Sequence, residues 1–192
     1  SVSVEGTVQS VGSHAFEDFE NLRTVKFSGS VKEIHSKALF GCTNLETLTV
    51  PFIGASASDG NTFGYIFGNT AIEGLTYGVG QQSNGNVNYQ LPVSLKNVTV
   101  LGGNIPNFSF KGAHELQSVV LPNTSTIGQQ ALYGCSGISE ITIPSAVSSL
   151  QSNAFYGTTG LEKVYYDGTL QTWVGRSFAD GPSNPLNNNK AI

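Results

Sequence analysis

Hydrophobic positions repeat along this chain in blocks of 23 residues. The first block holds six such positions, and each has an equivalent 23 residues later: Val11, Ala15, Phe16, Leu22, Val25 and Phe27, then Ile34, Ala38, Leu39, Leu45, Leu48 and Val50. The same frame returns from Ile127 to Ile143 and from Leu150 to Tyr166, while steps of 21 and 22 residues separate the middle units. A period of this length is typical of solenoid proteins, in which one repeat forms one coil.

Each unit predicts the same local structure. Two adjacent apolar residues are spaced for a short helical turn, and a glycine such as Gly41 or Gly134 permits a tight corner. A Leu-x-x-Leu-x-Val segment follows, whose last three positions alternate with the period of a strand. Proline closes this strand at Pro51, Pro122 and Pro144. A single coil cannot bury its apolar side chains, so neighbouring coils stack and share one core.

The sequence therefore predicts an α/β repeat fold, a solenoid with a parallel sheet on one side. We expect one domain over residues 1–192, with an irregular unit at about 52–94 and a cap-like C-terminal unit at about 167–192. Val2 and Val4 fit the strand positions of an earlier repeat, which favours a fragment of a longer array. Trp173 is interpreted as a capping residue rather than as a binding anchor.

The composition excludes several classes of partner and activity. Charged residues make up 11% of the chain, the net charge is −4, and neither sign forms a run, so nucleic acid and anionic membranes are not expected partners. No apolar stretch is long enough to insert into a membrane. His14, His35 and His114 lack further ligands at metal-binding spacing, and Cys42 and Cys135 fall in separate coils as free buried thiols. Without a catalytic motif, we predict no enzyme, no cofactor and no metal.

The sequence Ala-Leu-Phe-Gly-Cys-Thr-Asn-Leu at 38–45 and the segment Ile127 to Pro144 resemble the repeat of the BspA-like leucine-rich-repeat surface-protein family. The resemblance covers nearly the whole chain, although Phe19 and Ala113 depart from the usual residues. It implies a leucine-rich-repeat solenoid with a parallel sheet on its concave face. It also implies an extracellular or bacterial cell-surface protein whose array mediates adhesion to host matrix or cell-surface proteins. We expect a monomer. Two alternatives stay open: a structural spacer that displays another domain, and a glycan-binding module.

Residues that alternate with the buried strand positions should face outward along the sheet. They are either plain solvent-facing strand residues or a shallow ligand-binding platform. Val120 shares this phase, and the candidate binding residues are Thr24, Lys26, Thr47, Thr49, Asn97, Thr99, Ser118, Glu140, Thr142, Lys163 and Tyr165. In the irregular unit, Tyr65, Tyr77 and Tyr89 are candidate contacts, the other interpretation being that its aromatic residues fill the core where the repeat loses its register.

Overall fold

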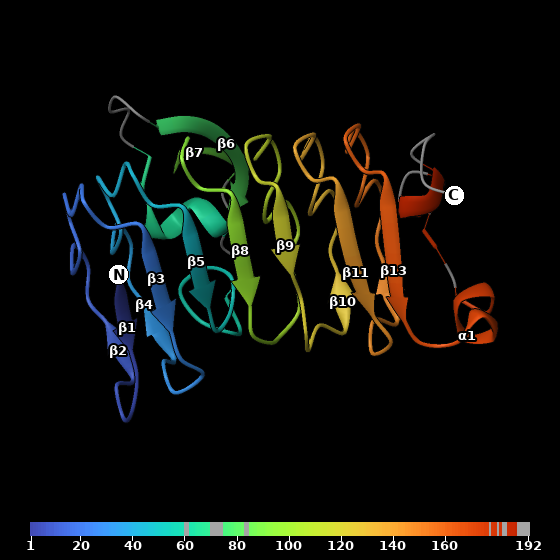
Figure 1. Ribbon diagram of the computed structural model, residues 1–192, viewed down its shortest axis with the longest axis horizontal. Helices are drawn as coiled ribbons and strands as arrows, with labels where there is room; N and C mark the ends of the chain where they lie inside the picture. Colours follow the sequence, from blue (N-terminus) through green and yellow to red (C-terminus); the bar gives the residue numbers. More distant parts are fainter. Residues whose placement is uncertain are drawn as a thin grey trace.

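The computed structural model describes residues 1–59, 62–69, 75–82, 85–176, 178–179, 181 and 184–187. Within 75–82 and 85–87 the description is confined to the backbone. These residues wind into coils that stack along one axis, from the first residues at one end to helix α1 (Leu170–Val174) at the other (Figure 1). The elongated stack is the solenoid that the 23-residue period predicts.

One parallel strand from each coil lines one side of the stack, in chain order (Figure 1). The described residues form a five-stranded sheet followed by a two-stranded one, made of β1 (Val2–Val4), β3 (Thr24–Phe27), β5 (Thr47–Val50), β8 (Asn97–Val100) and β9 (Ser118–Val120), then β11 (Glu140–Pro144) and β13 (Lys163–Asp167). Residues 23 positions apart face each other in the ladder, as Val25 faces Leu48. In these regular coils the 23-residue repeat therefore sets which residues pair across the ladder.

A second side of each coil carries very short strands, again in parallel pairs. They are β2 (Ser10–Val11) with β4 (Glu33–Ile34), and β10 (Thr126–Ile127) with β12 (Ser149–Leu150). Single bridges from Ile105 to Ile127 and from Leu150 to Phe178 extend this ladder. A corner that begins after each main strand turns the chain from the first side to the second.

The third side consists of turns that also bond from coil to coil. The amide of Phe16 donates to the carbonyl of Ala38 at 2.9 Å, and the amide of Gly134 donates to the carbonyl of Tyr156 at 2.8 Å. Short helical or turn segments were expected here, and the structure forms turns, because residues such as Lys37 and Gln130 take positive φ angles of 61° and 53°, which interrupt a right-handed helix within a few residues. The third side therefore consists of turns, and the regular coils are bonded to their neighbours on three sides.

The interior holds one column of apolar side chains per repeat position. Val25, Leu48, Val98, Val119 and Ile141 are each 3% exposed or less, and similar columns run through the other positions of the frame. Burying such side chains stabilises the fold by about 1.5–3 kcal/mol each. Because every coil contributes to the same columns, one coil's core is completed by the coils on either side.

Cys42 and Cys135 are free, buried thiols, as their shared repeat position predicts. Each donates a hydrogen bond to a backbone carbonyl in the preceding coil: Cys42 Sγ to Phe16 O at 3.1 Å and Cys135 Sγ to Phe110 O at 3.0 Å. Burial raises the pKa of the Cys42 thiol to about 11 and that of Cys135 to about 12. Both therefore stay protonated at neutral pH, and they join neighbouring coils.

We expect these thiols to resist modification until the solenoid opens, because the thiolate is the reactive form. Native protein at pH 8 should leave both cysteines unlabelled by a thiol-specific chromogenic reagent over hours, while protein in guanidinium chloride should react at both. Because the folded pKa values are raised, their contribution to stability is complete below the ordinary thiol pKa. It is lost as the pH rises through about 11 and 12. Rapid stoichiometric labelling of the native state would contradict this.

The middle coils have shortened corners. Seven positions separate Phe27 from Ile34 in one coil, whereas six separate Leu121 from Ile127 and five separate Val100 from Ile105. Among the described residues, no ladder pairing joins β9 to β11, although the coils remain bonded there on the turn side. The shortest corner, between Val100 and Ile105, lies between β8 and β9, which still pair, so corner length alone does not explain the interrupted sheet.

Thr124 lies in the shortened corner after Leu121, three residues before Ile127, where the regular coils place Val31 and Val147. Its side chain is fully buried, and its hydroxyl has no hydrogen-bond partner among the described residues. A buried hydroxyl without a partner costs about 1–3 kcal/mol. Thr124 is thus a local source of instability.

Replacing the hydroxyl with a methyl group should stabilise the protein. We expect Thr124→Val to raise the free energy of unfolding by about 1 kcal/mol, because it removes the unpaired oxygen at nearly constant volume. Thermal or urea unfolding would measure the change. Thr142→Val, at an exposed strand position, is the matched control and should be close to neutral. A destabilised Thr124→Val protein would show that the hydroxyl has a partner in solution.

The irregular unit inserts a hairpin between β5 and β8. Its antiparallel strands are β6 (Leu75–Gln82) and β7 (Gly85–Pro92), preceded by the 3-10 helix η1 (Phe63–Ile66). Phe63 is buried, its ring 4.9 Å from that of Phe110 and 5.7 Å from that of Phe67. These aromatic residues fill the core at the point where the 23-residue frame is lost.

Candidate functional site

The candidate face is the outward side of the parallel sheet, and two rows of side chains cross it. In the first row, ladder pairing aligns Thr24 with Thr47, Thr47 with Asn97, and Asn97 with Ser118. Glu140 and Lys163 form a further pair in β11 and β13. Adjacent members of a row are about 4.8 Å apart, the spacing of neighbouring strands.

The second row lies two residues further along each strand. It aligns Lys26 with Thr49 and Thr49 with Thr99, and it continues as the pair Thr142 and Tyr165. Burial alternates along the strands, with Val25 and Leu48 inside and their neighbours exposed or half-buried. The structure thus brings all eleven predicted face residues onto one side of the sheet, and their function remains a prediction.

The face changes character along its length. Its first part presents hydroxyl, amide and ammonium groups, while Val120 and Tyr165 near its far end are 47% and 51% exposed. Val120 pairs with Thr99 in the second row. Val120 shares the outward phase through its alternation with buried Val119, but it is not among the eleven candidates. Its apolar side chain at an outward strand position is the signal that could have identified it.

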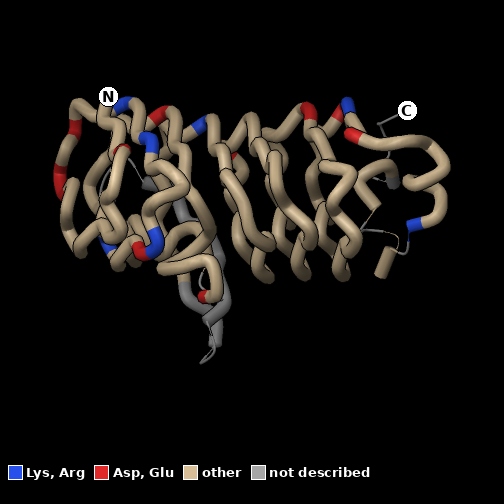
Figure 2. Tube along the Cα trace, turned by 90° about the horizontal axis from the view of Figure 1, so that it is seen from below, with Lys and Arg blue, Asp and Glu red and all other residues tan. Residues whose placement is uncertain are grey.

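Charges beside this face are largely paired. Arg23 forms an ion pair with Glu46, and Lys96 Nζ donates to Glu115 Oε2 at 2.8 Å. The hydrogen bond from Lys96 lowers the pKa of the Glu115 carboxyl. Basic and acidic residues lie interspersed along the trace (Figure 2). Such a surface provides little long-range attraction for a charged partner.

The three tyrosines of the irregular unit differ in their position. Tyr89 is 5% exposed, and a β-carbon at Gly64 would collide with its side chain. It therefore packs in the interior, in agreement with the core-filling interpretation. Tyr65 is half-buried and packs against the core, whereas the side chain of Tyr77 lies outside the described residues.

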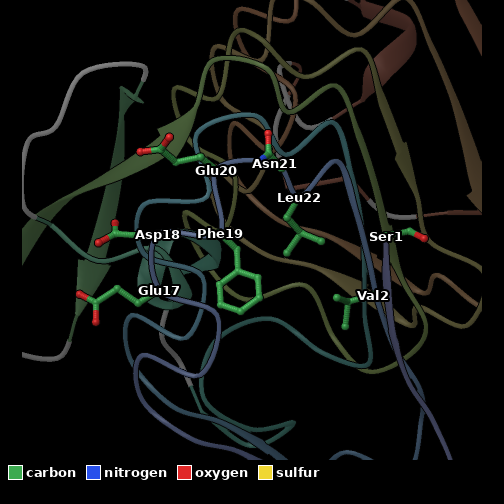
Figure 3. Close-up of a pocket in the computed structure, with 8 residues that line it drawn as sticks. All are labelled: Ser1, Val2, Glu17, Asp18, Phe19, Glu20, Asn21 and Leu22. Atoms are coloured by element: carbon green, nitrogen blue, oxygen red, sulfur yellow. The ribbon is translucent and has the colours of Figure 1, made fainter.

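A hollow of about 550 Å³ lies at the end of the stack formed by the first coil. It is lined by Ser1 and Val2 of the first strand and by the turn at 17–22. Figure 3 shows Val2, Phe19 and Leu22 around its centre, with the carboxylates of Glu17, Asp18 and Glu20 turned away from them. The hollow is the exposed end of the hydrophobic core, and it does not bring acidic groups together for catalysis.

The opposite end is closed by aromatic packing. The Trp173 ring, on α1, lies 5.1 Å from the ring of Tyr166 and 5.5 Å from that of Phe178, and Trp173 is 8% exposed. Arg176 donates to the carbonyl of Ser145 at 2.8 Å and to the Tyr166 hydroxyl, which lowers the pKa of that phenol. Trp173 therefore serves as a cap. A smaller hollow of about 270 Å³ remains between this cap and Leu186.

Titratable groups do not form a reactive cluster in the described part of the chain. Each histidine lies near one glutamate: His14 near Glu17 at 3.0 Å, His35 near Glu33 at 3.7 Å, and His114 near Glu115 at 3.5 Å. Among the described residues, no group of three His, Cys, Asp or Glu side chains could hold a metal ion. The same residues contain no helix that is long and apolar enough to cross a membrane.

The coils repeat the same leucine-rich pattern, and each contributes one strand to a parallel sheet. These features define a leucine-rich-repeat solenoid. A sequence profile of the BspA type leucine rich repeat region matches six copies over residues 1–78 and 87–187. The chain therefore belongs to the BspA-type leucine-rich-repeat family, whose members are in general non-enzymatic scaffolds. A search of curated proteins finds no match to this chain.

Two solved structures are similar to the chain. A leucine rich cell surface protein from Faecalibacterium prausnitzii is 19% identical with a TM-score of 0.34, over 93% of this chain and 62% of its own. A leucine-rich repeat protein from Bacteroides ovatus is 20% identical with a TM-score of 0.39, over 82% of this chain and 40% of its own. The chain thus spans less than two thirds of the length of either protein.

Proposed function

We propose that this chain is a protein-binding module of a bacterial cell-surface protein and that it contacts its partner through the outward face of the sheet. The observation that carries the proposal is the pair of aligned rows, of which the second holds Val120 and Tyr165 at 47% and 51% exposure. Solenoid faces of this kind offer extended area without a deep pocket, which suits a protein partner. The family supports a scaffold that binds rather than one that catalyses.

The chemistry of the face indicates how it binds. Exposed tyrosine and aliphatic side chains supply most of the energy in many protein interfaces, and surrounding hydroxyl groups supply hydrogen bonds at little desolvation cost. We place the energetic centre of the interface at Val120, Thr142 and Tyr165, with Thr49 and Thr99 toward its rim. On this basis we propose adhesion to an extracellular-matrix or cell-surface protein of a host, in an extracellular setting.

The test is binding of the purified chain to immobilised collagen, laminin and fibronectin, compared with single variants. Tyr165→Ala should weaken saturable binding at least tenfold, equivalent to about 1.4 kcal/mol. Tyr156→Ala is the matched control, since Tyr156 is 48% exposed but lies on the turn side of the solenoid, stacked on Tyr133 at 5.1 Å. Its binding should be unchanged, and circular dichroism should show both variants folded.

Three results would overturn the proposal. The absence of saturable binding by the intact chain at about 50 µM, weaker than most specific interfaces, would favour a spacer that displays another domain. Equal losses in Tyr165→Ala and Tyr156→Ala would place the binding energy elsewhere than on the sheet. Binding that a soluble polysaccharide competes away would indicate a glycan-binding module instead.

A further inference from the structure

Several strands lie at the edge of a described sheet, and two of these edges, on β1 and β13, are protected. β1 is three residues long, which limits how much a foreign strand can pair with it. β13 carries Lys163 and Asp167, and the Trp173 cap packs against its Tyr166. Short length, charge and cover are the usual means by which proteins keep sheet edges from pairing with other chains.

The outer edge of β6 is neither short nor charged. β6 is eight residues long and pairs only with β7 among the described strands. The segment at 74–95 contains no Lys, Arg, Asp or Glu, and β6 contains no proline. An eight-residue uncharged edge strand is a template for pairing with another strand.

The backbone directions of the hairpin show which groups are free. The amide of Gln90 in β7 donates to the carbonyl of Gly68 at 2.9 Å, so it points away from β6. In the antiparallel register Gln90 faces Tyr77, and this pair is therefore a non-hydrogen-bonded one. The amide and carbonyl of Tyr77 then point outward from β6, and by alternation so do those of Leu75, Val79 and Gln81.

The two edges of the hairpin are consequently different. The outer edge of β7 is partly used, because its Gln90 amide bonds to the turn that follows η1. The outer edge of β6 presents four residues whose amides and carbonyls have no ladder partner among the described residues. β6 is therefore the edge at which a further strand can add.

We propose that β6 pairs antiparallel with β6 of a second copy of this chain, so that two hairpins form one four-stranded sheet. Identical strands related by a two-fold axis are self-complementary in this arrangement. When the two-fold axis passes beside Gly78, Tyr77 of one copy pairs with Val79 of the other. All four outward-directed residues of β6 then take part in the pairing. Since the segment is uncharged, no like charges meet across the axis.

A second copy is the occupant that the composition favours. A partner of opposite charge would need a charged edge, and the 74–95 segment offers none. The pairing leaves the outward face of the main sheet unused, so self-association is independent of the proposed partner binding. The proposed dimer differs from the monomer expected from the sequence, because the sequence alone does not reveal the unpaired edge of β6.

Sedimentation equilibrium of the whole chain, from about 5 to about 200 µM, tests the proposal, because a dimer forms by mass action. The average mass should rise from the monomer value of 20.2 kDa toward twice that value. Val79→Lys, which introduces one charge per copy at the pairing edge, should abolish the rise. Asn88→Lys is the matched control, because Asn88 faces Val79 in the register but lies on β7, and it should still dimerise.

A second variant separates edge pairing from loss of the hairpin. Val79→Pro removes an outward amide and leaves the bonds between β6 and β7 intact, so it should also prevent dimerisation. Circular dichroism and the unfolding temperature should stay unchanged in all three variants. A monomeric chain across the whole concentration range would overturn the proposal. So would a dimer that persists in both Val79 variants. Tyr165→Ala should dimerise normally, which distinguishes this edge from the proposed binding face.

Discussion

The stacked fold depends on backbone hydrogen bonds that join the regular coils to their neighbours on three sides. A chain that satisfies its amides in the neighbouring coil must return to the same place after every turn. The 23-residue period meets this condition, since Val25 faces Leu48 in one ladder and Ile141 faces Val164 in another. The buried apolar columns then follow, because equivalent residues are stacked by the same register.

One junction between coils lacks part of this bonding. The corner between Leu121 and Ile127 is one residue shorter than in the regular coils, and the ladder between β9 and β11 is absent from the described strands. The long irregular unit preserves the core differently, by packing Phe63 against Phe110. Both deviations leave the interior closed and change what lies on the outside, where Val120 is exposed beside the interruption.

The sequence could predict the strands, the stacked core and the outward rows because all three follow from periodicity. The alternation of Val25 with Thr24 and Lys26 is enough to place the two exposed residues on the outer face. On the third side, spacing alone could not decide between helical segments and turns, because it does not reveal that Lys37 and Gln130 take positive φ angles. The interrupted sheet could not be predicted either, because β9 and β11 show the same alternation of buried and outward residues as strands that pair.

The missing ladder between β9 and β11 has a mechanical consequence. A load applied along the stack pulls adjacent coils apart, so the coils separate one at a time instead of sliding together. The junction between these two strands holds on two sides where regular junctions hold on three, and it offers the least resistance. Each 23-residue coil that opens releases about 75 Å of chain at roughly 3.3 Å per residue. An array built in this way lengthens in steps under tension, visible as separate force peaks in a pulling experiment, and dissipates energy as it does so.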